Sequence, residues 1–588
     1  MCLYIAPMHL HTHQAKDMET LGRRRRVAVL AWCNAIAMAL ALATPVAAVA
    51  ANHGDTAAAK DNVAVVPRIA ASAAAAASSV NVTAICMATP YPSACETALS
   101  SAAARGAAND PFAASVQFAM TRAESARALA RNLSASSSRP RVAPSGMDDC
   151  AELLDISLDQ LHDALAARAA DAAGVTTWLS AALTNQGTCG DSLAAVPDPA
   201  ARSAVRARVA ALEQFIGTAL ALHAKLNNGG SGSSSPAPPS RAAFPSWVTK
   251  HDRHLLSSPA STIAPDAVVA LDGSGTHTSI SDAIAAVTAP PPPAHHPTAS
   301  GGGGGGRSRK VIYVKAGRYE ESVSITSKQK DVMLLGDGKG KTVISGHRSV
   351  AGGYTTYASA TVAAMGSGFI AKGLTIVNSA GPGKGQAVAL RVGGDLSVVY
   401  NCGIEAYQDT LYVHSNRQFY AADDISGTVD FIFGNAAAVI QGCEIRARRP
   451  SPGQEDTVTA QGRSDPNQNT GISIHRCRIT GAPDLGGTPV YLGRPWRRYS
   501  RTVVMGTFLD RSIAPAGWLE WSGQFGLSTL YYGEYGNTGP GAGTRRRVTW
   551  SGVHTSMSTS DATRFTVANF IVGDAWLPAT GVTYTSGL

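Results

Sequence analysis

A chain of 588 residues is too long for a single hydrophobic core, which excludes a one-domain protein and predicts two or more domains. The hydrophobic fraction of 45% is typical of globular proteins, charged residues make up 15%, and the formal net charge is +9. A basic surface favours an anionic partner, which can be nucleic acid, an acidic membrane or an acidic polysaccharide. Charge alone does not choose among them, and a solvated basic surface without a partner remains the alternative.

The amino terminus has the pattern of a secretory signal. A basic run at residues 23–26 precedes residues 27–51, which carry no charge and end in small residues. This order predicts a signal peptide within residues 1–51 that is cleaved after Ala50 or Ala51. An uncleaved signal anchor is the alternative, because the apolar stretch is long enough to span a bilayer. Both alternatives predict that the remainder is exported.

Composition changes along the exported part. Residues 52–80 form a low-complexity spacer, and residues 81–226 carry apolar residues at helical spacing, which predicts a helical bundle. Residues 227–263 have the composition of a flexible linker. From residue 264 to 588, short runs of Val, Ile, Tyr and Phe are separated by Gly and Asn, as is typical of strands. A Pro- and Gly-rich insertion at residues 289–306 is predicted to be disordered.

The cysteines and the glycosylation sequons are consistent with export through an oxidising compartment. Asn81 and Asn132 begin N-x-S/T sequons. Two cysteines lie in the leader and seven follow it: Cys86, Cys95, Cys150, Cys189, Cys402, Cys443 and Cys477. An oxidising compartment favours disulfides among these seven. Because seven is odd, one thiol is expected to remain unpaired.

The strand-rich region contains a repeat. Four isoleucines each stand two residues after a cysteine or an aspartate: Ile404, Ile425, Ile445 and Ile479 follow Cys402, Asp423, Cys443 and Cys477. The steps between the isoleucines are 21, 20 and 34 residues, which predicts a parallel β-helix with one coil per step and a longer loop in the last. A β-propeller or a β-sandwich is the alternative, although the propeller repeat is longer and sandwich strands do not repeat one position so regularly.

This register makes a prediction about the cysteines. Cys443 and Cys477 occupy one position on adjacent coils, which is within the Cα separation of a disulfide. Cys402 lies two coils from Cys443, too far for a bridge. We therefore expect a Cys443–Cys477 disulfide and an unpaired Cys402.

Two pairs of polar residues recur at the same one-coil spacing. Gln386 and Gln408 are 22 residues apart and Asp409 and Asp430 are 21 apart, so these side chains are predicted to gather on one outer face. Neighbouring carboxylates repel, and protonation of one relieves the repulsion. One ionised and one protonated aspartate make a nucleophile and a general acid, while glutamine amides can donate to a developing oxyanion. Aspartates that only cap coil corners are the alternative.

A set of motifs in the second half decides between these alternatives. They are "GRYEE" (317–321), "GDGKGKTVISG" (336–346), "GQAVALR" (385–391), "YQDTLYVHSNRQFY" (407–420), "GTVDFIFGNAAAV" (427–439), "ARRPSPGQEDTVTAQGRSDPNQNTGISIH" (447–475) and "YLGRPWRRYSRTVVM" (491–505). Together they resemble plant pectin methylesterases, and the resemblance runs from Ala264 to Leu588. It implies a right-handed parallel β-helix, in agreement with the repeat.

The resemblance also implies roles for the polar residues. Asp430 is the nucleophile that attacks the methyl-ester carbonyl of a galacturonate unit, and Asp409 is the general acid and then the base. Gln408 and Gln386 stabilise the oxyanion. Arg494 pairs with Asp430 and keeps it ionised and aimed.

Further residues are implied to contact the substrate, together with Gln386 and Arg494. Trp496, Trp521, Tyr412 and Phe433 match an aromatic floor for sugar rings, and Thr356 matches a substrate-contacting threonine. Exposed aromatic residues are otherwise ordinary surface or core residues, so this match is less specific than that of the carboxylates.

The helical region has a resemblance of its own. The segment "CMATPYPSAC", from Cys86 to Cys95, and "ALTNQGTCGDSL" around Cys189, with Cys150 between them, are similar to the pectin methylesterase inhibitor domain. That domain is a four-helix bundle preceded by a helical hairpin. The resemblance implies the disulfides Cys86–Cys95 and Cys150–Cys189, and a pro-enzyme whose bundle restrains activity until it is removed.

The family is cut at a motif of two basic residues followed by two leucines. Here the motif is expected at Arg253, His254, Leu255 and Leu256, with a subtilisin-like protease as the processing partner. His254 departs from the second basic residue and puts efficient processing in doubt.

These observations predict a secreted hydrolase of the plant cell wall that removes methyl groups from homogalacturonan as a monomer, without a metal, an organic cofactor or a nucleic-acid partner. Asp423 and Gly385, often cysteine and histidine in relatives, depart from the family outside the catalytic positions. A β-helical glycosidase or lyase is the first alternative, and the glutamine donors argue against it. A non-catalytic inhibitor with a pectin-binding β-helix is the second, and the complete set of catalytic residues argues against that.

Overall fold

The structure is a computed structural model that describes residues 81–103, 110–135, 144–168, 170–228, 263–290 and 309–588. Residues Ser78–Leu588 form one compact unit. Several predictions fall outside the described residues: the leader at 1–51, the spacer at 52–80, the processing motif at 253–256 and most of the insertion at 289–306.

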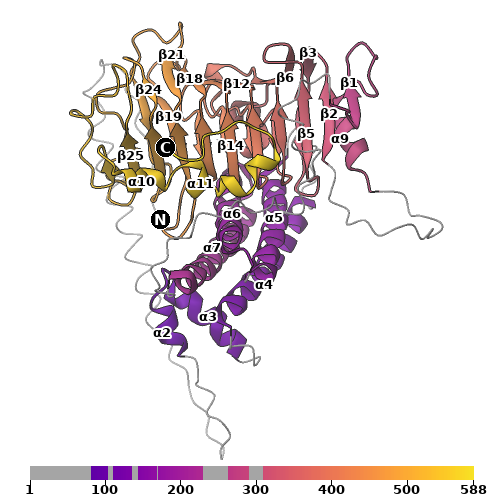
Figure 1. The fold of residues 1–588 in the computed structure, drawn as a ribbon. Coiled ribbons are helices and arrows are strands. Elements are labelled where there is room, and N and C mark those ends of the chain that lie inside the picture. The colour runs from indigo at the N-terminus through magenta and orange to yellow at the C-terminus, as the bar shows by residue number, and fades with distance from the viewer. Residues whose placement is uncertain (1–80, 104–109, 136–143, 169, 229–262, 291–308) are drawn as a thin grey trace, which may run out of the picture. The chain divides into compact units, whose positions relative to one another are not determined.

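The amino-terminal part of this unit is helical (Figure 1). Its elements are α2 (Val82–Cys86), α3 (Pro92–Ala103), α4 (Pro111–Ala135), α5 (Gly146–Ala166), α6 (Ala172–Ser192), the short 3₁₀ helix η1 (Leu193–Ala195) and α7 (Pro199–Asn228). Helices α4 to α7 pack into a four-helix bundle, and α2 and α3 form a hairpin. None of the helices in the described segments is both long and apolar enough to cross a membrane.

Local sequence explains how the bundle is held together. The start of α5 is fixed by a capping box, in which the Ser145 side chain accepts from the Asp148 amide and the Asp148 side chain accepts in return. Fully buried apolar residues such as Leu154, Leu179 and Leu212 fill the centre. The disulfides Cys86–Cys95 and Cys150–Cys189 are present as predicted. The first closes the hairpin and the second joins α5 to α6.

The carboxy-terminal part is a parallel β-helix, as predicted, built from three sheets whose strands alternate along the chain (Figure 1). The eleven-stranded sheet contains, in spatial order, β1 (Ala267–Val269), β2 (Lys310–Val314), β5 (Val332–Gly336), β8 (Ile370–Lys372), β11 (Ser397–Tyr400), β14 (Arg417–Ala421), β17 (Ala437–Gln441), β20 (Gly471–His475), β23 (Arg501–Met505), β25 (Tyr531–Tyr535) and β26 (Val553–His554). Every strand pair in the three sheets of the described region is parallel, so each sheet runs along the stack of coils.

The other two sheets complete each coil. The seven-stranded sheet contains β4 (Val323–Ile325), β7 (Val362–Ala364), β10 (Leu390–Val392), β13 (Leu411–Val413), β16 (Ile432–Gly434), β19 (Asp456–Gln461) and β22 (Val490–Gly493). The eight-stranded sheet contains β3 (Gly317–Glu320), β6 (Thr342–Gly346), β9 (Thr375–Asn378), β12 (Gly403–Glu405), β15 (Asp424–Gly427), β18 (Glu444–Ala447), β21 (Arg478–Gly481) and β24 (Phe508–Leu509).

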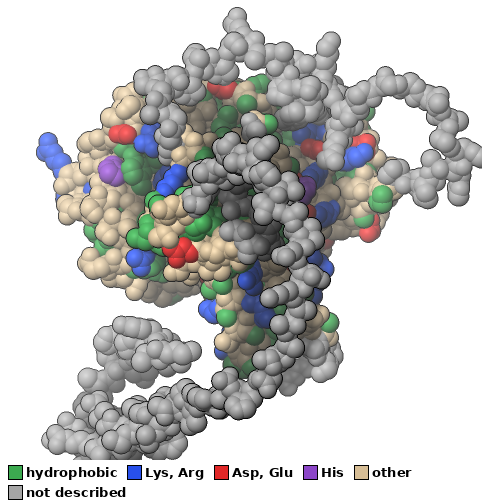
Figure 2. Space-filling model, turned by 90° about the horizontal axis from the view of Figure 1, so that it is seen from below, with side chains coloured by type: hydrophobic (Ala, Val, Ile, Leu, Met, Phe, Trp, Pro, Cys, Tyr) green, Lys and Arg blue, Asp and Glu red, His purple; other side chains and the backbone are tan. Residues whose placement is uncertain are grey.

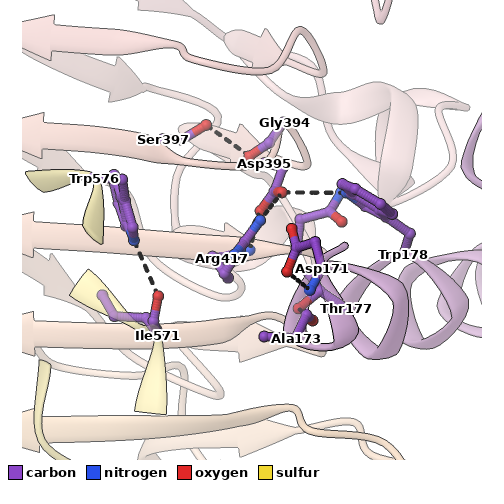
Figure 3. Close-up of polar contacts among 12 residues, drawn as sticks. Asp171, Ala173, Thr177, Trp178, Gly394, Asp395, Ser397, Arg417, Ile571 and Trp576 are labelled. Carbon is purple, nitrogen blue, oxygen red and sulfur yellow. Dashed lines mark hydrogen bonds and ion pairs between the residues drawn. The ribbon is translucent and has the colours of Figure 1, made fainter. Parts of the chain in front are cut away.

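Short helices pack against the β-helix at the start and at the end of its sequence. The predicted helix near its start is α9 (Ile280–Thr288), whose Ile280 and Ile284 are buried in the same core as the coils. The carboxy-terminal elements are α10 (Thr559–Thr563), α11 (Val567–Phe570), η6 (Gly573–Ala575) and η7 (Leu577–Ala579). The buried Trp576, whose indole N–H donates to the Ile571 carbonyl at 3.0 Å, packs with them against the outside of the eleven-stranded sheet (Figure 3).

The isoleucine repeat stacks as predicted. Ile404 pairs with Ile425, Ile425 with Ile445, and Ile445 with Ile479 in successive strands of the eight-stranded sheet. All four side chains are fully buried in the interior. Their stacking at the strand spacing of about 4.8 Å builds a continuous apolar column.

The Cys443–Cys477 disulfide prediction was wrong. Both thiols are free and buried, as is Cys402. At this position each backbone N–H donates to the side chain of the next coil: Cys402 to Asp423 Oδ1 at 2.7 Å, Asp423 to Cys443 Sγ at 3.3 Å, and Cys443 to Cys477 Sγ at 3.4 Å. The stacked side chains point the same way at the strand spacing, beyond the Cβ separation that a disulfide adopts. Cys402 is free as expected, but it is not the odd thiol of a paired set.

This arrangement predicts the labelling of the cysteines. When the unreduced full chain is denatured and alkylated, Cys402, Cys443 and Cys477 should be modified quantitatively, because none is in a disulfide. Cys86, Cys95, Cys150 and Cys189 should be labelled only after reduction. Peptide mass spectrometry measures this directly, and a disulfide-linked peptide pair containing Cys443 and Cys477 would contradict the structure.

Candidate active site

The two predicted catalytic aspartates occupy equivalent corners of adjacent coils. Asp409 lies two residues before β13 and Asp430 two residues before β16, and Leu411 pairs with Ile432 in these neighbouring strands. Asp409 has φ of 63° and Asp430 has φ of 53°, in the left-handed region that few residues other than glycine and Asn or Asp adopt. Such strained conformations cluster at functional sites, and here they point both carboxyl groups out of the coil.

Asp430 is surrounded by donors. Arg494 donates from Nε to Oδ1 at 2.8 Å and from Nη2 to Oδ2 at 2.7 Å. The Thr457 hydroxyl donates to Oδ1 at 2.7 Å and accepts from the Asp430 amide at 2.8 Å. A bidentate charge-assisted pair fixes the direction of a carboxylate as well as stabilising it. Pairing with Asp430 also outweighs burial at Arg494, so the pKa of this guanidinium lies above its usual value.

Asp409 has the opposite environment. Its side chain is buried, and burial together with the charge of Asp430 raises its pKa well above the usual range, while Arg494 opposes the shift only in part. The raised pKa of Asp409 favours its protonated form beside Asp430. The sequence predicted such a division for this pair from their one-coil spacing.

One cavity of about 570 Å³ is lined by every residue predicted to be catalytic or to contact substrate. These are Gln386, Gln408, Asp409, Asp430, Arg494, Thr356, Tyr412, Phe433, Trp496 and Trp521. Tyr412 and Phe433 stack with ring centroids 4.2 Å apart, and the Arg494 guanidinium lies 4.6 Å from the Trp521 ring centroid. The cavity thus combines an aromatic wall with the carboxyl pair.

The helical bundle closes part of the same cavity. Thr188, Asp191 and Ser192 at the end of α6, and Ala194 and Ala195 in η1, also line it. The Thr188 hydroxyl lies 3.3 Å from the Tyr412 hydroxyl and 3.1 Å from His414 Nε2. Asp191 pairs with Arg497 at 2.5 Å. The end of α6 therefore lies over the aromatic wall.

A second contact lies nearer the start of α6 (Figure 3). The Trp178 indole N–H donates to Asp395 Oδ2 at 3.3 Å, and Asp395 is also paired with the buried Arg417 at 2.6 Å. Burial raises the pKa of Asp395, but the charge and hydrogen bonds of Arg417 lower it by more. This carboxylate is therefore already satisfied within the β-helix, and the bundle adds one further donor.

A third contact comes from α5 and was not predicted. Asp149 Oδ2 accepts from the Thr355 hydroxyl at 2.5 Å, and Glu152 Oε1 accepts from the Tyr357 hydroxyl at 3.2 Å. Thr355 and Tyr357 flank the predicted Thr356, and Tyr357 begins the 3₁₀ helix η4 (Tyr357–Ser359). The signal available in the sequence was this position beside Thr356 in "GYTTY".

Thr457 and His414 were also missed. Thr457 holds Asp430, and it stands in the quoted motif "EDTVTAQ" without any feature that marks it. His414 is fully buried, and burial followed by the charge of Arg391 lowers its pKa to about 3, so it is neutral where it meets Thr188. Contacts in space identify both residues, whereas their spacing in the sequence does not.

Both parts of the chain match families of known proteins. Residues 266–574 match the family "Pectinesterase", and residues 80–222 match "Plant invertase/pectin methylesterase inhibitor". The chain is 49% identical to "Probable pectinesterase/pectinesterase inhibitor 35" of Arabidopsis thaliana over 82% of this chain and 88% of that protein. It is 46% identical to "Pectinesterase 2" of Citrus sinensis over 82% and 89%.

A solved structure agrees with these matches. "Pectin methylesterase from Carrot" is 52% identical, with a TM-score of 0.52, and covers 56% of this chain and 100% of that one. The class of protein is therefore a carboxylic ester hydrolase on a parallel β-helix. The chain belongs to the pectinesterase family and carries an amino-terminal domain of the inhibitor family.

The α5 contact predicts a pH-dependent interface. Burial raises the pKa of Asp149 to about 6, against the hydrogen bonds of Thr355 and Ser192 and the charge of Arg391. In a separated bundle this carboxyl group would titrate near 3.9. Because the pKa is raised on docking, docking is strongest below about pH 3.9 and weakens as the pH rises from there to about 6, by up to about a hundredfold for two pKa units.

Calorimetry of bundle and β-helix between pH 4 and 8 measures this, after the folded chain has been cut within 229–262. Asp149→Asn should remove most of the slope. Part of it should remain, because burial also raises the pKa of Glu213 and Asp465. An unchanged slope in Asp149→Asn would contradict the assignment.

Proposed function

We propose that this protein is the precursor of a pectin methylesterase in which Asp430 is the nucleophile and Asp409 the general acid and base. The observation that carries the proposal is the pair of aspartates that line one cavity, one held by Arg494 and Thr457 and the other buried, with a pKa that burial and the charge of Asp430 raise. The match to the pectinesterase family supports pectin, a methyl-esterified polygalacturonate, as the substrate class.

The first half-reaction forms an acyl enzyme. An Asp430 carboxylate oxygen attacks the carbonyl carbon of the methyl ester, and the carbonyl oxygen becomes an oxyanion that accepts from the side-chain amides of Gln386 and Gln408. As the intermediate collapses, the bond to the methoxy oxygen breaks and this oxygen takes the proton of Asp409. Methanol leaves, Asp409 becomes a carboxylate, and the substrate is joined to Asp430 as an anhydride.

The second half-reaction reverses the proton flow. The Asp409 carboxylate takes a proton from a water molecule, whose oxygen attacks the substrate carbonyl carbon of the anhydride. The bond to Asp430 breaks and frees its carboxylate, which Arg494 again stabilises. The product is a galacturonic acid unit, and Asp409 is again protonated for the next ester.

The aromatic wall suits a polysaccharide. Tyr412, Phe433, Trp496 and Trp521 offer ring faces to sugar rings, and Thr356 offers a hydroxyl. On the face shown in Figure 2, basic and acidic side chains are both spread among hydrophobic and uncharged ones. The formal net charge of +9 suits a product that becomes more anionic as the reaction proceeds. The predicted secretory leader directs the enzyme to the plant cell wall.

The bundle is proposed to be an intramolecular inhibitor. The end of α6 lines the catalytic cavity and covers Tyr412, so a polysaccharide chain cannot lie along the aromatic wall while the bundle is docked. Cleavage at the predicted motif of Arg253, His254, Leu255 and Leu256 by a subtilisin-like protease would release it. Regulation then depends on both cleavage and dissociation.

Substitution tests the catalytic roles. Asp430→Asn should lower methanol release from highly methylated pectin by at least about a thousandfold, because the nucleophile is lost. Asp409→Asn should lower it by about 10²–10⁴-fold, because an amide cannot protonate methanol. The matched control is Asp424→Asn, a partly exposed aspartate on β15 outside the cavity, which should retain full activity. Full activity in Asp430→Asn would exclude it as the nucleophile.

Inhibition by the bundle is tested in the folded chain. A site-specific protease sequence replaces residues 253–256, and methanol release is measured before cleavage, after cleavage, and after separation of the two parts. Only the separated β-helix part should be fully active, because docking blocks the cavity. Equal activity in the uncut chain would contradict inhibition while leaving the esterase assignment intact.

A further inference from the structure

The hairpin of α2 and α3 contacts the β-helix, although none of its described residues lines the catalytic cavity. Tyr91 stands in the loop that the Cys86–Cys95 disulfide closes, directly before α3. Its hydroxyl donates to Asp465 Oδ2 at 3.1 Å. Asp465 is fully buried, and its Oδ1 accepts from the backbone N–H and the side-chain amide of Asn467. Within the described part of the chain, Tyr91 is therefore the one donor to Oδ2.

A glycine in α7 makes room for this contact. Gly217 lies inside the helix, where glycine is less favourable than alanine. A Cβ atom at Gly217 would lie 2.4 Å from Tyr91 Cε2 and 3.3 Å from Asp465 Oδ2. The first distance is shorter than van der Waals contact allows, so a larger residue would push the ring away from α7. The missing side chain at Gly217 thus lets the Tyr91 ring cross α7 and reach the β-helix.

The loop at residues 463–469 holds Asp465 in place through bonds within the β-helix part. Gln468 Oε1 accepts from the Asp465 N–H at 3.2 Å, and Arg463 Nε donates to the Gln468 carbonyl at 2.9 Å. The same loop meets α6, because the Gln468 side-chain amide donates to the Ser180 carbonyl at 2.9 Å. The loop therefore has the properties of a preformed docking surface, whose shape is set by its own hydrogen bonds.

The bond from Tyr91 to Asp465 matters because both groups are taken out of water. Burial, followed by the charge of Asp465, raises the pKa of Tyr91, so the hydroxyl remains a donor. Burial also raises the pKa of Asp465, and the hydrogen bond from Tyr91 acts in the opposite direction, in favour of the carboxylate. A buried carboxylate oxygen that loses its donor is strongly disfavoured. A docked bundle without the Tyr91 hydroxyl would leave Oδ2 in that state.

We propose that Tyr91 and the loop at residues 463–469 form a latch that keeps the bundle docked after the linker has been cut. The loop is the docking surface, and the partner that fits it is a hairpin tyrosine that crosses a helix at a glycine. The latch does not line the catalytic cavity, so it acts on release of the bundle and not on the ester. The proposal rests on the proposed function, because release regulates activity only if the docked bundle inhibits.

Dissociation of the cut chain tests the latch without any substrate. The folded chain, with the site-specific protease sequence at residues 253–256, is cut, and sedimentation of a dilution series gives the Kd of the two parts. Tyr91→Phe should raise this Kd by about tenfold, because it removes a hydrogen bond to a charged group and keeps the ring. Asp465→Ala should raise it similarly. The two substitutions together should raise it by less than the product of the single effects, because they remove the same bond.

Two further variants complete the test. Gly217→Ala should also raise the Kd by about tenfold, even though alanine favours the helix, because its methyl group displaces the ring. The matched control Tyr584→Phe removes a similar bond, to Asp574 Oδ1 at 3.0 Å in the carboxy-terminal segment, and should leave the Kd unchanged. An unchanged Kd in Tyr91→Phe or Gly217→Ala, or independent effects of Tyr91→Phe and Asp465→Ala, would overturn the latch. Methanol release by the separated β-helix part is measured independently, and its absence would refute the proposed function instead.

Discussion

The site depends on the stacking of parallel coils at one strand spacing. Residues about 21 apart in sequence become neighbours in space, so a carboxyl group repeated at that interval is repeated at a distance where two charges cannot both be tolerated without compensation. Asp409 and Asp430 are such a pair. Arg494 and Thr457 hydrogen-bond to Asp430, whereas burial and the charge of Asp430 raise the pKa of Asp409.

The interface between bundle and β-helix combines an apolar cluster with polar contacts. Leu153, Leu193 and Val209 of the bundle belong to one buried cluster with Tyr412, Phe433 and Ala460 of the β-helix. Trp178, Thr188 and Asp149 each meet a polar group of the β-helix, and several of these groups are also satisfied within their own domain, as Asp395 is by Arg417. Separation of the two parts exposes the apolar cluster to water, which favours the docked state. Release of the site therefore requires dissociation as well as cleavage.

Much of this arrangement was predictable from sequence, because a β-helix repeats its positions. The isoleucine column, the corner positions of both aspartates and the convergence of the ten predicted residues on one cavity all follow from the one-coil register and the family motifs. The same register misled for Cys443 and Cys477. Proximity along the stack is necessary for a disulfide, but stacked side chains point in parallel, and here the sulfur atoms accept backbone hydrogen bonds instead.

The sequence alone could not predict roles that arise from contacts between distant segments. Thr457 matters because it reaches Asp430 from the next coil, and His414 because it meets Thr188 of the bundle. Neither has a characteristic spacing or composition around it. The α5 carboxylates likewise gain meaning only when they meet Thr355 and Tyr357.

The protonation states of the two aspartates test the account most directly. Infrared difference spectra of the full chain at neutral pH, comparing the parent protein with Asp409→Asn and with Asp430→Asn, isolate the band of a protonated carboxyl group. Other buried acids such as Asp423, whose pKa burial also raises, cancel in the difference. The account predicts that this band is lost in Asp409→Asn and kept in Asp430→Asn. Loss of the band in Asp430→Asn alone would reverse the roles of acid and nucleophile and contradict the account.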